Sequence, residues 1–269
     1  MMKPFIAILL ILFMCYACQT EQDNNSADAN AKRFEAYIQM LSAQVAQHPD
    51  SVGLRLQLAA AYDSAGEFSK AFIQMDTLLA KDSANYGLWY NLGQIAEDAK
   101  DTAKAMFSYD KALRIYPSPD ALLSLANLYA EQKNQNALIL SQQVKDFGLG
   151  RETDAHAAFI TGIYYARTGN IEKALASFDN CIANNYTYME AYIEKGLVYF
   201  DAQQYQEALN IFVFASTINA LDADTYYWQG RCYEMMHIND SAALRYKQSL
   251  NLSRNDSVVA AAIQRVEKK

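Results

Sequence analysis

Residues 88–117 read LWYNLGQIAEDAKDTAKAMFSYDKALRIYP, and this arrangement of small and aromatic residues returns along the chain about every 34 residues. One column of the repeat holds tyrosine, at Tyr62, Tyr129, Tyr165, Tyr199 and Tyr233. A second column holds alanine, at Ala71, Ala105, Ala174, Ala208 and Ala242. Aromatic and small positions lie three or four residues apart, which is the period of a helix, and no segment alternates as a strand would. The sequence therefore predicts an all-α chain of repeated helix pairs.

The second unit resembles the tetratricopeptide repeat, a unit of two antiparallel helices. The residues that stand where that family places W, L, G, A, F, A and P are Trp89, Leu92, Gly93, Ala105, Tyr109, Ala112 and Pro117, and Ala96 departs where the family prefers tyrosine. The fifth and sixth units match at Tyr192, Gly196, Tyr199, Ala208, Phe212, Ala215, Tyr226, Gly230, Tyr233, Ala242 and Tyr246. The resemblance implies a tetratricopeptide-repeat solenoid, a right-handed superhelix of about six helix-turn-helix units with capping helices at both ends.

Small residues are expected wherever two helices of a unit approach closely, as at Gly196 with Ala208. Gly66 and Gly169 lie in the turns between helices, where a residue free to adopt positive φ ends the first helix. The third unit is irregular, because Ala137 comes one residue early and about three extra residues between 147 and 153 restore the phase.

The repeat spacing divides the chain into a leader, a tether, the repeats and two caps. We expect an export signal over residues 1–17, a flexible tether over 18–31 and an N-terminal capping helix over 32–50. The six repeat units over 52–256 are expected at 52–85, 86–119, 119–151, 155–188, 189–222 and 223–256. A C-terminal capping helix over 257–269 completes the chain, since stacked repeats need polar-backed helices at their open ends.

The leader has Lys3, an apolar run over residues 5–14 and then CYAC. Ten apolar residues span only ~15 Å as a helix, about half of a bilayer's hydrocarbon thickness, so a cleaved signal is favoured over a permanent anchor. Cleavage before Cys18 resembles a bacterial lipoprotein signal, in which the new terminal cysteine receives lipid, although Cys15 and Tyr16 depart from its usual pattern. This interpretation predicts a lipoprotein in the bacterial cell envelope, at the outer membrane or the periplasmic face. The alternative is an ordinary secretory peptide and a secreted or periplasmic protein.

Composition and motifs argue against several function classes. The net charge of −7 becomes −8 once Lys3 leaves, and no basic patch interrupts it, so nucleic acid is an unfavourable partner. The histidines are scattered and no catalytic or phosphate-binding motif occurs, so we expect no enzyme, no metal, no cofactor and no small-molecule substrate. Cys181 and Cys232 are expected to be small packed residues without a disulfide.

In tetratricopeptide proteins the concave surface is lined by the first helix of each unit, and carrying this over by repeat position names candidate residues. The first three units would show Leu56, Asp63, Tyr90, Gln94, Glu97, Asn127 and Glu131. The last three would show Phe159, Ile163, Ile193, Leu197, Phe200, Tyr227 and Arg231, an apolar and aromatic set with one cation. Large apolar residues outside the packing columns favour a binding patch. The alternative is that a terminal helix or tight curvature covers them.

The hypothesis from sequence is an exported, lipid-anchored scaffold that binds a protein or peptide partner in this groove. Its layout resembles that of lipoproteins acting in envelope assembly. One alternative is a glycan or cell-wall accessory protein that stacks sugar rings on Tyr90, Tyr227 and Phe200. Another is a spacer that binds nothing in the groove.

Overall fold

The computed structural model describes residues 31–268, and all of their regular secondary structure is α-helical. These residues form part of two compact units, Met1–Ser108 and Tyr109–Lys269, and the division falls within α5 (Thr102–Ile115). The expected export signal, Cys18 and nearly all of the expected tether lie outside the described residues. Within the described range, no helix is both long and apolar enough to cross a bilayer.

The first unit contains a helix that covers residues 31–47 and is followed by two helix pairs. The next helices are α2 (Val52–Ser64), α3 (Phe68–Lys81), α4 (Tyr86–Asp98) and the first half of α5. The helix over 31–47 buries Ile38, Leu41 and Val45 against Leu58 and Ala61 of α2, so it covers the apolar face of the first helix pair.

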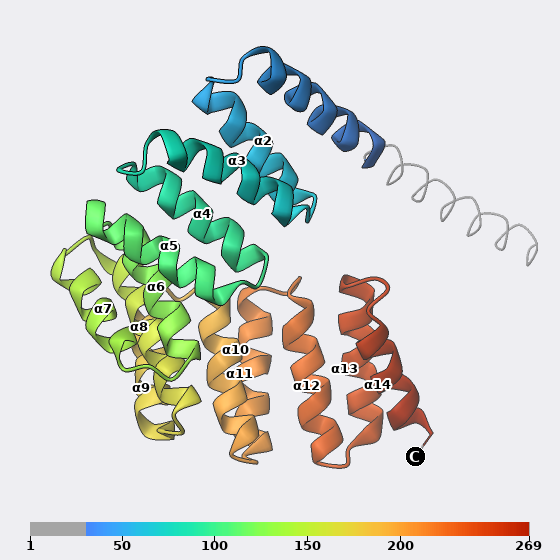
Figure 1. Cartoon of the computed structure of the whole chain (residues 1–269). Helices are drawn as coiled ribbons and strands as arrows, with labels where there is room; N and C mark the ends of the chain where they lie inside the picture. The colour runs from blue at the N-terminus through green and yellow to red at the C-terminus, as the bar shows by residue number, and fades with distance from the viewer. Residues whose placement is uncertain (1–30, 269) are drawn as a thin grey trace, which may run out of the picture. The chain divides into compact units, whose positions relative to one another are not determined.

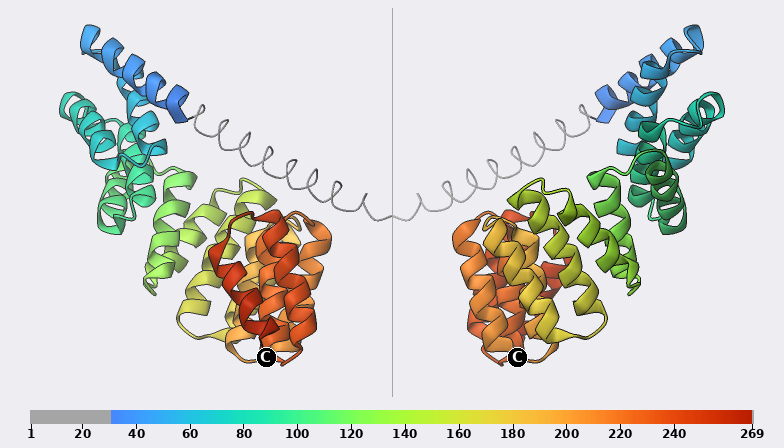
Figure 2. Two further views of the ribbon diagram at one scale, coloured as in Figure 1. Left: turned by 90° about the vertical axis from the view of Figure 1, so that its right-hand side faces the viewer. Right: turned by 90° about the vertical axis from the view of Figure 1, so that its left-hand side faces the viewer.

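The second unit continues the same pattern of antiparallel helices (Figure 1). Its helices after α5 are α6 (Pro119–Glu131), α7 (Asn136–Asp146), α8 (Arg151–Arg167), α9 (Ile171–Asn184), α10 (Met189–Asp201), α11 (Tyr205–Ile218), α12 (Ala223–Met235), α13 (Asn239–Leu252) and α14 (Ser257–Glu267). From α6 on, each helix packs on the next along the chain, and α8 also packs on α6 and α10, and α10 on α12. Figure 2 shows these helices from two further sides, with α14 against α13 at the end of the row.

Each turn inside a helix pair has the same backbone. The second residue after the end of the first helix takes the left-handed conformation, at Gly66 (φ 71°), Lys100 (60°), Lys133 (59°), Gly169 (81°), Gln203 (60°) and His237 (62°). The next N–H then reaches back five residues, as when Gln204 donates to the carbonyl of Tyr199 at 2.9 Å. This bond satisfies a carbonyl at the helix end that has no partner within the helix. The positive φ predicted at Gly66 and Gly169 is confirmed.

Three glycines let an aromatic ring lie against the backbone of the first helix. A Cβ on Gly162, Gly196 or Gly230 would stand 2.5, 2.4 or 2.5 Å from a ring atom of Phe178, Phe212 or Tyr246. All three rings are fully buried. The close contact expected at Gly196 is therefore present, and it includes the ring of Phe212, which fills the space a side chain on Gly196 would need.

The third helix pair is irregular, as its sequence predicts. Its second helix, α7, has 11 residues, whereas the second helices α3, α5, α9, α11 and α13 have 14. The chain then turns through Gly148 (φ 63°) and Gly150 (φ 102°), and α8 is 17 residues long instead of 13. The extra turn of α8 brings Arg151 to the carbonyl of Ala183, at the end of α9.

At the other end, α14 buries Val259, Ala262 and Val266 against Ala242 and Tyr246 of α13, as expected of a capping helix. Cys181 and Cys232 are both buried and unpaired, as predicted. Burial raises the pKa of each thiol to about 12, so neither is a reactive nucleophile at neutral pH.

Candidate partner-binding face

The structure places some predicted groove residues inside the core. Ile163 in α8 is only 2% exposed and belongs to a buried cluster with Ala158 and Phe178, so it offers no surface to a partner. Phe159, one turn earlier, is half-buried with its ring 5.9 Å from that of Phe178 and 5.1 Å from that of Tyr188. Side chains of the same unit therefore cover this part of the predicted groove.

The α10 candidates are partly available. Ile193 and Leu197 are half-buried and pack on a cluster formed by Leu209, Phe212 and Cys232. Because they remain partly exposed, these two side chains can contribute apolar contact area to a binding surface, but they are not its main contact.

Tyr90 lies in the first unit, on α4, and is half-buried with its ring stacked on Tyr86 at 5.8 Å and 12°. Tyr90 therefore belongs to a different compact unit from the other candidates.

Phe200, Tyr227 and Arg231 come together with Trp228, and we call these four residues the Arg231 cluster. The ring of Trp228 meets Phe200 edge-on at 5.5 Å and Tyr227 at 5.3 Å. The guanidinium carbon of Arg231 lies 5.5 Å from the Phe200 ring centre and 5.8 Å from that of Trp228. Arg231 Nη1 donates to the Tyr227 hydroxyl over 3.4 Å, which is long for a hydrogen bond. The aromatic side chains thus hold the guanidinium in place by cation–π contact.

Among the described residues Arg231 donates no hydrogen bond to a carboxylate, and the acid that acts on its charge, Glu234, does so without direct contact. Its Nε is buried and donates to no hydrogen-bond acceptor, and the nearest acid on its helix, Glu234, is already held by Arg265 at 2.6 and 2.7 Å and by the Tyr246 hydroxyl at 2.7 Å. The desolvation of this half-buried cation is offset only by the long bond to Tyr227 and by the more distant Glu234 carboxylate, so an incoming anion would add the direct charged partner that Arg231 lacks.

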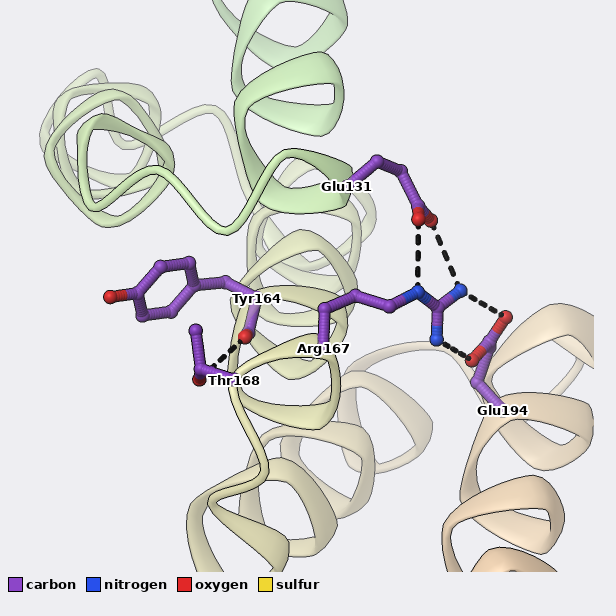
Figure 3. Close-up of polar contacts among 5 residues, drawn as sticks. All are labelled: Glu131, Tyr164, Arg167, Thr168 and Glu194. Carbon is purple, nitrogen blue, oxygen red and sulfur yellow. Dashed lines mark hydrogen bonds and ion pairs between the residues drawn. The ribbon is translucent and has the colours of Figure 1, made fainter.

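Arg167 of α8 is the opposite case (Figure 3). Its Nε and Nη2 donate to Glu131 of α6 at 2.9 and 3.1 Å, and Nη1 and Nη2 donate to Glu194 of α10 at 3.1 and 3.2 Å. These bonds to Glu194 and Glu131 raise the pKa of Arg167 above its ordinary value. Nearby, the Thr168 hydroxyl donates to the Tyr164 carbonyl at 2.8 Å. Arg167 therefore ties three successive first helices together, with four of its five N–H donors engaged by two carboxylates.

Sequence reasoning named Arg231 and Glu131 but missed Trp228, Arg167 and Glu194. A signal for Trp228 was present, since it lies three residues before Arg231 on one helix and so shares its face. The Arg167 bridge needs the spacing between helices, which the sequence alone does not supply. Across residues 31–268, no group of three or more histidine, cysteine, aspartate or glutamate side chains could hold a metal ion.

Comparison with solved structures gives relatives of the same fold. A tetratricopeptide repeat protein from Parabacteroides merdae ATCC 43184 superposes with a TM-score of 0.72 at 18% identity, over 89% of this chain and 94% of that chain. PilW, described as a widely conserved type IV pilus biogenesis factor, gives 0.65 at 19% identity, over 80% and 98%. Yeast Tom70 gives 0.56 at 18% identity, over 87% of this chain and 58% of its own. At these identities the likeness is one of fold alone.

Sequence comparison adds direct evidence of family. A search of curated proteins finds no match. Two family models, each described as tetratricopeptide repeat, match residues 86–119 and 161–213. Both matched segments consist of the paired helices and aligned turns described above. The chain is a tetratricopeptide repeat protein.

Proposed function

We propose that this chain is an exported, lipid-anchored scaffold that binds a protein or peptide partner at the Arg231 cluster. The observation that carries the proposal is Arg231 itself, a half-buried guanidinium held on aromatic rings that donates no hydrogen bond to a carboxylate. Fixed in this way, its free donors can engage a carboxylate in a two-point contact.

The contrast with Arg167 supports a binding role over a packing role. Both arginines lie on first helices of the second unit, yet Arg167 makes four charge-assisted hydrogen bonds and Arg231 makes one long bond to a neutral phenol. A structural arginine at this position would be expected to have a carboxylate partner, as Arg167 does.

The partner class follows from the surroundings of Arg231. Ile193, Leu197 and the edges of the aromatic rings supply apolar surface, so a polypeptide that brings an apolar side chain and a carboxylate fits best. Sugar stacking is less favoured, because Arg231 already lies over the rings of Phe200 and Trp228.

The partner can be identified by placing a photo-crosslinking amino acid at Tyr227 in the native cell, followed by mass spectrometry. Purified partner is then titrated against wild type, Arg231→Gln and Arg254→Gln. Arg254 is an exposed arginine of the same unit, so its variant removes the same charge elsewhere. We expect Arg231→Gln to weaken binding about tenfold or more and Arg254→Gln to change it little, because loss of a two-point charge contact costs about 1.5–3 kcal/mol. Equal affinity of the two variants would contradict the proposal.

The lipid anchor is tested separately. Cys18→Ala should move the protein from the membrane fraction to the soluble envelope fraction, because the cysteine is the expected site of acylation. Cys15→Ala is the matched control and should leave the protein in the membrane fraction. Membrane retention of the Cys18 variant would argue against acylation, and it would not affect the binding proposal.

A further inference from the structure

The second unit has a hollow of about 350 Å³ at the irregular third helix pair, far along the chain from the Arg231 cluster. It is lined by Pro117, Leu122, Gln143, Asp146 and Phe147, and we call it the Phe147 hollow. Leu122 belongs to a buried cluster with Val144 and Ala157. The hollow therefore opens from the surface onto the core of the unit.

The hollow is lined by Leu122 of α6, by Gln143 and Asp146 of α7, and by Pro117 and Phe147 in the connections after α5 and α7. The chain leaves α5 through Ile115 and Tyr116, which are 40% and 60% exposed, just before Pro117. It leaves α7 through Phe147 and Leu149, which are 45% and 57% exposed. Of these four exposed residues Phe147 lines the hollow itself, and an exposed aromatic ring at the edge of an apolar hollow favours a binding surface.

The backbone holds this arrangement in place. α7 ends at Asp146, and Gly148 and Gly150 both take positive φ, so the connection turns sharply between Phe147 and α8. A Cβ at either glycine would meet nothing within 4 Å, so the glycines serve the backbone conformation and not close packing. Phe147 is thus directed to the surface by the same irregularity that shortens α7.

The charge of the lining indicates which chemical group the Phe147 hollow binds. Asp146 is the one charged residue in the lining, and its side chain accepts a hydrogen bond from the neutral Gln142 amide at 2.8 Å. The carboxylate lies in a chain of net charge −7. It disfavours contact with an anionic bilayer and favours a cation on the incoming group.

We infer that the Phe147 hollow is a second docking site, which takes a large apolar side chain of a partner polypeptide with a lysine or arginine beside it. The apolar side chain fills the space between Pro117, Leu122 and Phe147, and the cation pairs with Asp146. This site is separate from the Arg231 cluster, and it prefers a positively charged group where the Arg231 cluster prefers a negatively charged one.

The test uses the mature chain and three acetylated, amidated tetrapeptide probes: serine-phenylalanine-lysine-serine, the same peptide with glutamate for lysine, and the same peptide with alanine for phenylalanine. Backbone amide shifts are followed by NMR as each probe is titrated into the millimolar range. We expect saturable shifts within residues 117–122 and 143–149 for the first probe, about threefold weaker binding of the glutamate probe, and no response to the alanine probe.

Variants distinguish specific binding in the Phe147 hollow from non-specific association of the peptides with the protein. Asp146→Lys should reverse the preference between the lysine and glutamate probes, and a lysine is tolerated at the end of a helix. Phe147→Ser should abolish the response and, as a change at an exposed residue, keep the fold, which circular dichroism checks. Asp76→Lys, a matched change at an exposed residue of the first unit, should leave the shifts caused by the tetrapeptides unchanged. Arg231→Gln, which weakens binding at the Arg231 cluster, should also leave these shifts at the hollow unchanged.

Four results would overturn the inference. These are the lack of saturable shifts, equal responses to all three probes, the same shifts on raising protein concentration without a probe, and vesicle binding that Phe147→Ser removes. The third would assign the hollow to a second copy of the chain, and the fourth to a lipid surface. Because Arg231→Gln is neutral here, the inference and the proposed function can fail independently.

Discussion

At the scale of single residues, the fold depends on glycines that let aromatic rings touch a helix backbone. Gly196 is the clearest case, because Phe212 is fully buried and its ring is stacked on Trp228 at 6.1 Å and 20°. A methyl group at this position would push Phe212 toward Trp228 and so disturb the Arg231 cluster.

We therefore expect Gly196→Ala to lower the free energy of unfolding by ~1–3 kcal/mol, the usual cost of overpacking a core. Gly53→Ala is the control, because its Cβ would meet nothing within 4 Å in the first turn of α2. The control should be neutral or stabilising by up to ~1 kcal/mol. Urea unfolding of both variants measures the difference, and equal stability of the two would show that the ring is free to move aside.

At the scale of elements, the turns show how much the sequence could predict. Glycine signals a left-handed residue, so the backbone at Gly66 and Gly169 was predictable. Lys100, Lys133, Gln203 and His237 take the same conformation without that signal. There the hydrogen bonds of the turn impose the backbone on a residue that disfavours it.

Gln203→Gly should therefore raise the melting temperature, since an ordinary residue in this conformation costs about 1 kcal/mol. Gly169→Ala is the reciprocal change and should lower it by a similar amount, because a Cβ there meets no neighbour and only the backbone conformation is strained. Calorimetry of the two variants measures both shifts. If both changes move stability in the same direction, backbone strain is not the cause.

The candidate site was less predictable than the fold. Repeat position identifies which helix face a residue occupies, and on that basis Arg231 and Ile163 looked alike. Their burial differs because the neighbouring helices cover Ile163 in the core around Phe178, whereas Arg231 stays partly open among aromatic rings. That difference depends on packing between units, which sequence spacing does not encode.

The C-terminal helix α14 is held by a charged contact as well as by its apolar face. Glu234 of α12 accepts two hydrogen bonds from Arg265 of α14 and one from Tyr246, and Arg265 and Tyr246 hold the pKa of Glu234 at about 2. Because this pKa lies below the usual value of 4.5, the contact stabilises the fold at neutral pH and is lost as pH falls from about 4.5 toward 2.

Glu234→Gln should lower the free energy of unfolding by ~2 kcal/mol at pH 7. This difference in unfolding free energy between the variant and wild type should become smaller below pH 4.5. Glu267→Gln removes the exposed pair between α14 and Lys247 and should cost less than ~1 kcal/mol. Urea midpoints across this pH range measure both. If the difference in unfolding free energy between Glu234→Gln and wild type stays constant down to pH 2.5, the ionised carboxylate is not what holds α14.

At the scale of the whole molecule, the second unit of the repeat fold carries two proposed binding sites that prefer ligands of opposite charge. The chain is acidic overall, so at long range it attracts basic partners. Arg231 then selects a single carboxylate at short range, and Asp146 selects a cation beside an apolar side chain. A partner that uses both sites would carry both charges at a fixed spacing.

A crystal structure of the complex with the crosslinked partner shows directly whether Arg231 binds a carboxylate. We expect a partner carboxylate within hydrogen-bond distance of Arg231 Nη1 or Nη2, with apolar partner side chains on Leu197 and Phe200. A partner bound elsewhere, with the Tyr227 hydroxyl still the one hydrogen-bond partner of Arg231, would contradict it.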